Sequence, residues 1–130
     1  MDEFKHVLMV VEDEPDIRLI IRLHLTADPR IIVEGEAANA MDAIELARST
    51  DPGLIILDHQ IEGSIMGLDA APLLKEAAPE AKILLFTAFD LANEADASPA
   101  VDAFLSKSDM SLLLPVSLQL LGLEPALRGS

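Results

Sequence analysis

Five short apolar runs alternate with segments whose hydrophobic residues recur at helical spacing. The runs are rich in Leu, Ile and Val and predict strands over His6–Val11, Ile31–Val33, Leu54–Leu57, Lys82–Phe86 and Val101–Leu105. The segments between and after them predict helices from Pro15 to before Asp28, then over Ala38–Arg48, Leu68–Ala78, Asp90–Ala97 and Ser111–Leu123. Strands and helices in strict alternation are typical of a parallel sheet covered by helices on both faces. The predicted fold class is therefore α/β.

Three of the helices have features of their own. In the first, Ile17, Ile20, Ile21, His24 and Leu25 recur at helical spacing, and we expect this stripe to face the core. The fourth has a poor helical pattern and is expected to be short or mobile. The last carries more leucines than one core stripe needs, so either Pro115 shifts its register within a tight core or part of it is exposed.

Length and charge limit the possible functions. The 130 residues fit one domain, assigned to residues 1–124, followed by a short C-terminal tail over residues 125–130. The net charge of −14 argues against direct binding to nucleic acid or to a membrane surface, while 51% hydrophobic residues argue against disorder. The chain has no cysteine, no secretory segment and no apolar run near the ~20 residues that cross a bilayer. These features predict a soluble, cytoplasmic protein.

Polar residues follow the carboxyl ends of four predicted strands, where the functional cleft of an open α/β sheet lies. They are Glu12 and Asp13 after the first strand, Asp58 after the third, Thr87 after the fourth and Lys107 after the fifth. Three carboxylates this close are unfavourable unless a cation neutralises them, and Mg²⁺ prefers such oxygen ligands. With a cation present, Asp58 could attack a phosphoryl group, and Lys107 and Thr87 could contact its remaining oxygens.

Each of these residues also has an ordinary structural interpretation. Asp58 alone would be a helix cap or turn residue, the acidic run could complement a helix N-terminus, and Thr87 and Lys107 alone would be surface residues. His59 could be a solvated loop residue or a neighbour of the phosphoryl group. The combination, in register at one sheet edge, favours the phospho-acceptor interpretation.

Four motifs resemble those of response-regulator receiver domains in two-component signalling. "VVEDEPDIR", "LIILD", "LLFTA" and "DAFLSK" occur in the family's order, at the ends of strands one, three, four and five. The resemblance covers nearly the whole chain. It implies a flavodoxin-like three-layer sandwich with five helices around a five-stranded parallel sheet in the order 2-1-3-4-5.

The resemblance also implies a role for each matching residue. Asp58 would accept the phosphoryl group from a sensor histidine kinase, a phosphotransfer protein or a small phosphodonor. Asp13 and Asp58 would hold Mg²⁺ directly, Glu12 would act through water, and the backbone carbonyl of Gln60 would complete the ligands. Lys107 would pair with the phosphate.

Other family positions concern switching and lifetime. Thr87 and Phe104 would form the switch pair. Gln60 and Phe89 would tune water access to the phosphoryl group, and the bulk of Phe89 predicts a long-lived phosphoryl state. The sequence departs from the family pattern at Ser108, where proline is usual, so either this loop differs or it is strained. It also departs at Glu62 in the loop after Asp58.

Leucines on the first and last helices predict an interaction surface. Leu19, Leu23, Leu112 and Leu113 are expected to be exposed, and to dock a kinase or phosphotransfer helix bundle or to form a homodimer. The overall prediction is a single-domain response regulator that catalyses its own Mg²⁺-dependent phosphorylation and dephosphorylation, without being a turnover enzyme. It would signal through contacts with an unknown output protein. The alternative is a non-phosphorylated pseudo-receiver that acts as an interaction module.

Overall fold

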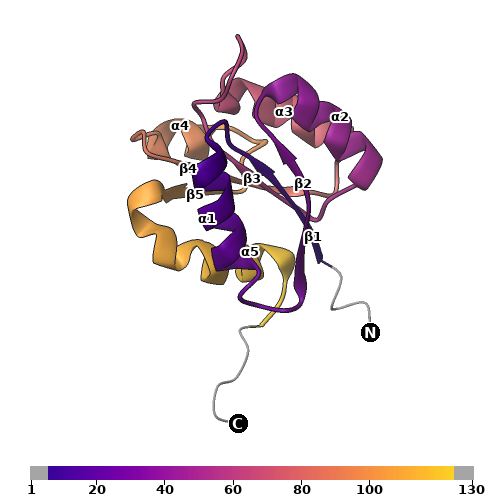
Figure 1. Cartoon of the computed structure of the whole chain (residues 1–130). Coiled ribbons are helices and arrows are strands. Elements are labelled where there is room, and N and C mark those ends of the chain that lie inside the picture. Colours follow the sequence, from indigo (N-terminus) through magenta and orange to yellow (C-terminus); the bar gives the residue numbers. More distant parts are fainter. Residues whose placement is uncertain (1–5, 125–130) are drawn as a thin grey trace.

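The computed structural model describes residues 6–124, with side chains from residue 11 onward. The strands are β1 (His6–Val11), β2 (Ile31–Ala37), β3 (Leu54–Leu57), β4 (Lys82–Thr87) and β5 (Ala103–Ser106). The helices are α1 (Pro15–Leu25), α2 (Ala40–Thr50), α3 (Gly67–Ala77), α4 (Ala92–Ala97) and α5 (Leu113–Leu121), with a 3-10 helix, η2 (Lys107–Leu112), before α5. Figure 1 shows the helices around the central sheet. The predicted tail, residues 125–130, lies outside the described residues.

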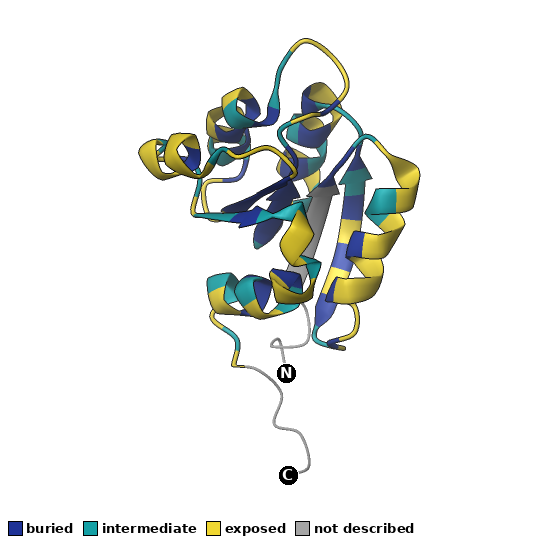
Figure 2. Ribbon diagram, turned by 90° about the vertical axis from the view of Figure 1, so that its left-hand side faces the viewer, coloured by how far each residue is buried: buried dark blue, intermediate teal, exposed yellow. Residues whose placement is uncertain are grey.

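The five strands are parallel and lie in the order β2-β1-β3-β4-β5, as the family resemblance implies. Alternate side chains of β3 enter two separate cores. Ile55 and Leu57 pack with residues of α2, α3 and α4, whereas Leu54 and Ile56 pack with residues of α1 and α5. Both faces of the sheet are therefore covered, and Figure 2 shows buried strands between more exposed helices. The predicted α/β class is confirmed.

Several element boundaries differ from the prediction: β2, for example, continues past Val33 to Ala37. Two of the differences have a visible cause. β5 begins at Ala103 and not at Val101, because the amide of Val101 donates to the carbonyl of Ser98 and closes a turn after α4. α5 begins at Leu113, after η2, and not at Ser111. Pro115 lies in the first turn of α5, where an amide hydrogen has no helical partner and proline is tolerated. The predicted brevity of the fourth helix is confirmed, because α4 has six residues.

The core-facing stripe of α1 is narrower than predicted. Ile21 and Leu25 are buried and Ile17 is partly buried, but Ile20 and His24 are exposed. The prediction that Ile20 and His24 face the core is wrong, because α1 packs along residues spaced four apart. The Nδ1 atom of His24 lies 3.1 Å from the carbonyl oxygen of Ile20 in the preceding turn.

Candidate functional site

Two buried carboxylates lie at the carboxyl ends of neighbouring strands. Glu12 follows β1 and is 1% exposed, and Asp58 follows β3 and is 5% exposed. Their backbones continue the sheet: the amide of Asp58 donates to the carbonyl of Val11 and that of Glu12 to the carbonyl of Ala37, both at 3.0 Å. The sheet therefore fixes both residues, and burial of two like charges requires a positive partner.

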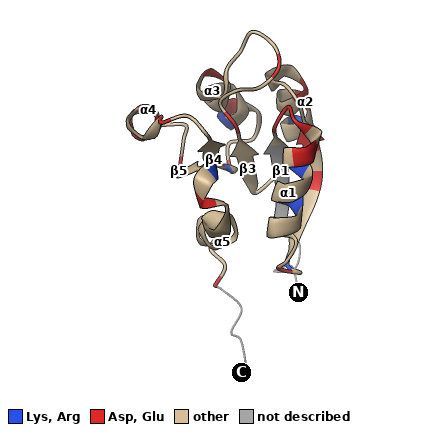
Figure 3. Cartoon of the chain, turned by 60° about the vertical axis from the view of Figure 1, so that its left-hand side comes forward, with Lys and Arg blue, Asp and Glu red and all other residues tan. Residues whose placement is uncertain are grey.

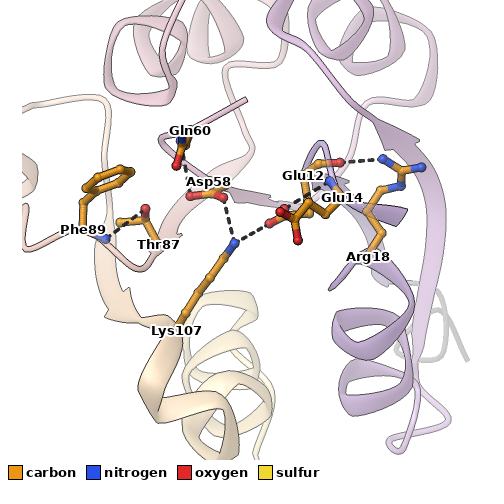
Figure 4. A network of polar contacts seen from close by, with 8 residues as sticks. All are labelled: Glu12, Glu14, Arg18, Asp58, Gln60, Thr87, Phe89 and Lys107. Carbon is orange, nitrogen blue, oxygen red and sulfur yellow. Dashed lines mark hydrogen bonds and ion pairs between the residues drawn. The ribbon is translucent and has the colours of Figure 1, made fainter. Parts of the chain in front are cut away.

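Lys107 supplies that partner. Its Nζ lies 2.7 Å from Oε1 of Glu12 and 2.8 Å from Oδ2 of Asp58, so one ammonium bridges both carboxylates (Figure 4). Burial raises the pKa of the Glu12 carboxyl above its ordinary value, although the hydrogen bond from Lys107 opposes this. Burial lowers the pKa of Lys107, but its hydrogen bonds to Asp58 and Glu12 outweigh burial and the net pKa is raised. The cluster therefore holds two acids with a single cation.

The residue after Lys107 is accommodated by a turn. The Oγ of Ser106 accepts a hydrogen bond from the amide of Ser108 at 3.2 Å and caps η2. No cis peptide bond occurs in residues 6–124. The sequence left two possibilities for serine at this position, a loop that differs from the family pattern or a strained loop. The structure has the first: a turn with trans peptide bonds, capped by Ser106.

Arg18 fixes the turn between β1 and α1, a role that sequence reasoning missed. Its Nη1 donates to the backbone carbonyl of Glu12 at 2.6 Å, and its Nε lies 3.4 Å from Oε1 of Glu36. The amide of Glu14 donates to Oε2 of Glu12 at 3.3 Å. Both ends of Glu12 are thus held. The position of Arg18 near the start of α1, shortly after the acidic pair, is the signal that could have identified it.

Gly67 lets α3 start against the backbone of Asp58. A Cβ atom at this position would clash with the carbonyl oxygen of Asp58 and with Cα of His59. The amide of Gly67 donates to the carbonyl of His59 at 2.7 Å. Only glycine fits this approach without moving the loop that carries Asp58. Nothing local in the sequence indicates the contact, because it depends on how the loop folds back.

The other predicted site residues lie around the cluster of Glu12, Asp58 and Lys107. Thr87 is fully buried at the end of β4, and its Oγ1 accepts a hydrogen bond from the amide of Phe89 at 3.4 Å. The amide of Gln60 lies 3.4 Å from Oδ1 of Asp58. Figure 4 shows Gln60 next to Asp58, with Thr87 and then Phe89 on the side of Asp58 away from Glu12. Phe104 lies half-buried in β5, against the core that includes α4.

The predicted magnesium ligands are only partly brought together. Glu12 and Asp58 share Lys107, but within residues 6–124 no group of three or more His, Cys, Asp or Glu side chains is arranged to hold a metal ion. Asp13, which is partly buried, therefore does not complete a three-acid group with them. The buried carboxylate pair still fits a hard cation in its donor chemistry, because it consists of oxygen ligands carrying negative charge.

The leucine surface is smaller than predicted. Leu19, Leu23 and Leu112 are exposed, and α1 and α5 are neighbours. Leu113 is 0% exposed and packs in the core under α1 and α5, so the prediction that it is exposed is wrong. As the first residue of α5, Leu113 points back to the sheet, whereas Leu112 is 47% exposed at the end of η2.

The family model of the response regulator receiver domain matches residues 8–114. The chain belongs to the response-regulator receiver family. It is 35% identical over 80 residues to the nitrate/nitrite response regulator protein NarL of Escherichia coli K12, a match that covers 62% of this chain and 37% of NarL. It is 34% identical over 110 residues to NarP of the same strain, covering 82% of this chain and 51% of NarP. The chain therefore spans about half or less of these relatives' length.

Solved structures support the fold. A LuxR-family two-component response regulator from Aurantimonas sp. SI85-9A1 superimposes with a TM-score of 0.81 at 27% identity, covering 92% of this chain and 88% of that one. Receiver domains of response regulators act in two-component signal transduction, in which histidine kinases are their partners.

None of the described helices has the length and apolar character needed to span a bilayer.

Proposed function

We propose that this receiver domain accepts a phosphoryl group on Asp58 from a sensor histidine kinase, a phosphotransfer protein or a small phosphodonor. The observation that carries the proposal is a buried Asp58 carboxylate whose Oδ2 lies 2.8 Å from the Lys107 ammonium at the open end of β3. Burying a carboxylate at a strand end lowers the stability of the fold. We therefore infer that Asp58 is placed there for its reactivity, at the sheet edge where α/β proteins have their functional sites.

In this reaction an Oδ of Asp58 attacks phosphorus. The new O–P bond forms as the bond from phosphorus to the donor breaks, and the donor atom keeps the electron pair. With a phosphohistidine donor the leaving atom is an imidazole nitrogen, and with acetyl phosphate it is a carboxylate oxygen. The Lys107 ammonium can donate hydrogen bonds to the transferred phosphoryl group, because it already contacts Asp58 and bears three donors.

Asp13, Asp58, Glu12 through water and the backbone carbonyl of Gln60 would hold Mg²⁺. When bound, Mg²⁺ supplies positive charge to the phosphoryl oxygens. Thr87 would donate its hydroxyl to a phosphoryl oxygen and give up the 3.4 Å contact with the amide of Phe89. Phe104, two residues before Ser106 on the neighbouring strand, would respond to that movement.

We propose that the receiver domain passes on its signal through contacts with another protein and does not itself contact nucleic acid. Acidic residues are spread over several helices and loops (Figure 3), and the net charge is −14. RcsB of Salmonella enterica serovar Typhimurium, a fold neighbour at 20% identity, was solved bound to a promoter, and this chain covers 60% of that chain. In a longer protein of that kind, DNA contact would belong to residues beyond the receiver domain.

A second candidate function is a pseudo-receiver that binds a partner without phosphorylation. It is favoured by one observation: Lys107 already bridges Glu12 and Asp58, so the carboxylate pair has a cation of its own. In this alternative the bridge would be a permanent structural element.

Intact mass after incubation with acetyl phosphate and Mg²⁺ distinguishes the two functions. We expect a gain of about 80 Da in the wild-type protein and none in Asp58→Asn. The same measurement with a histidine kinase as donor follows if acetyl phosphate fails. A folded wild-type protein that gains no mass from either donor would overturn the phospho-acceptor proposal and favour the pseudo-receiver.

A further inference from the structure

His59, the residue after Asp58, is fixed through both its backbone and its ring. Its carbonyl accepts a hydrogen bond from the amide of Gly67 at 2.7 Å, and its Nδ1 accepts one from the amide of Leu68 at 3.2 Å. Gly67 and Leu68 are the first two residues of α3, whose amides have no partner within the helix. The N-cap residue Met66 makes no side-chain hydrogen bond. The His59 ring therefore takes the place of a side-chain cap.

The same ring contacts Phe89 in the loop between β4 and α4. The two ring centroids lie 6.0 Å apart and the planes meet at 84°, an edge-to-face pair. Phe89 is 45% exposed, and its neighbours Ala88 and Asp90 are exposed as well. Since little else in the described loop buries the Phe89 ring, we expect its contact with the His59 ring to decide the position of the Phe89 ring.

Phe89 lies on the same side of Asp58 as Thr87, which is the side that faces away from Glu12 (Figure 4). Its amide contacts Thr87. Hydrolysis of an aspartyl phosphate needs a water oxygen to attack phosphorus while the bond to the Asp58 oxygen breaks. The carboxylate then keeps the electron pair and the water proton passes to solvent. We expect an apolar ring on this side of Asp58 to restrict the positions from which water can approach the phosphoryl group.

We propose that His59 is a positioning residue: its ring, fixed on the N-terminus of α3, holds Phe89 on this side of Asp58 and slows hydrolysis of the phosphoryl group. This inference rests on the proposed phosphorylation of Asp58. An edge-to-face pair changes an equilibrium by about two- to tenfold, so losing it should speed hydrolysis by a factor in that range.

Three substitutions at His59 separate the ring contact from the cap. His59→Ala removes both, His59→Asn keeps an acceptor of similar reach for the amide of Leu68 but has no ring, and His59→Phe keeps a ring but has no acceptor. His24→Ala is the matched control, because His24 is exposed on α1. Each protein is phosphorylated with acetyl phosphate and Mg²⁺, freed of donor by desalting, and followed by intact mass as the added ~80 Da is lost.

We expect His59→Ala and His59→Asn to lose the phosphoryl group about two- to tenfold faster than wild type. His59→Phe and His24→Ala should stay near the wild-type rate. In a Phe89→Ala background, His59→Ala should have no further effect, because the residue through which it acts is gone. A purely structural role for the cap would reverse the order, with His59→Asn near wild type and His59→Phe fast. That order, or effects that multiply in the double variant, would overturn the proposal.

A second readout does not depend on phosphorylation. In the unmodified protein, the NMR shifts of the Phe89 ring protons should move in His59→Ala and be largely restored in His59→Phe. Amide hydrogen exchange at Leu68 should respond to His59→Phe and not to Phe89→Ala. Unchanged Phe89 shifts in His59→Ala would refute the ring contact and overturn the proposal for His59, whether or not Asp58 is phosphorylated. A wild-type protein that gains no phosphoryl mass from acetyl phosphate or from a histidine kinase would refute the proposed function, and with it the effect of His59 on hydrolysis.

Discussion

Replacing Lys107 by methionine should destabilise the protein, because it leaves Glu12 and Asp58 buried without their cation. The substitution keeps the length of the side chain and removes two charge-assisted hydrogen bonds of 2.7 and 2.8 Å. Removing one partner of a buried ion pair typically costs about 3–5 kcal/mol. The Lys107 side chain is 21% exposed, so solvent screens part of the interaction, and we expect a loss of about 2–3 kcal/mol at pH 7.

The pH dependence of this loss has a defined sign. The folded-state pKa of Lys107 is raised, so its stabilising effect is present below the pKa of unfolded lysine, about 10.4, and disappears as pH rises through the folded-state value. At the acid end, the pKa of Glu12 is already raised by burial and would rise further without Lys107. The loss caused by Lys107→Met should therefore shrink as pH falls and the Glu12 carboxylate takes up a proton.

Urea unfolding followed by far-UV circular dichroism measures the effect, since the chain has no Trp to follow by fluorescence. Lys82→Met is the matched control, because Lys82 is exposed at the start of β4, and it should change the free energy of unfolding by less than about 0.5 kcal/mol. Mg²⁺ at millimolar concentration should restore part of the stability of Lys107→Met if it binds the freed carboxylates. Equal stabilities for Lys107→Met and Lys82→Met at pH 7 would refute the reasoning.

Four further substitutions test the packing and the charges. Leu113→Ala should lower the free energy of unfolding by about 2–5 kcal/mol and Leu112→Ala by less than about 1 kcal/mol, because only the first side chain is fully buried; equal losses in urea unfolding would contradict this placement. Ser117→Ala should stabilise the protein by about 1 kcal/mol, measured in the same way, because the buried Ser117 hydroxyl has no hydrogen-bond partner among the described residues. Asp28→Asn should cost about 1–2 kcal/mol at pH 7. The hydrogen bond from Arg30 lowers the pKa of Asp28, so the stabilisation exists above the unfolded pKa of about 3.9 and disappears as pH falls through the folded value. Unfolding curves of wild type and variant should converge in acid.

The fold followed from the sequence because buried parallel strands and their helices leave different periodicities. Leu54–Leu57 is apolar at every position and is buried at every position in β3. The α1 stripe was predicted less well, since Ile20 and His24 fit helical spacing as well as Ile21 and Leu25 do. Spacing alone does not say how wide a face the neighbouring elements will cover.

The site followed from the sequence to the extent that strand ends position it. Glu12, Asp58 and Lys107 meet because each directly follows a strand of one parallel sheet. Gly67 and His59 were not predicted in their roles, because both depend on the path of the loop after Asp58. Loop paths are set by contacts that are distant in sequence, and no local pattern encodes them.

The charge balance of the cluster links phosphorylation to a divalent cation. Glu12 and Asp58 bring two carboxylates to one ammonium, so the unmodified cluster carries about one negative charge when both are ionised. Phosphorylation of Asp58 would replace its carboxylate by a group of charge about −1.5 to −2, which Lys107 alone cannot neutralise. A cation that binds the phosphorylated form more tightly than the unmodified form stabilises the phosphorylated form by the same factor. The affinity of this protein for Mg²⁺ should therefore rise on phosphorylation, and Asp13, which lies next to Glu12, is the carboxylate available to supply the additional ligand.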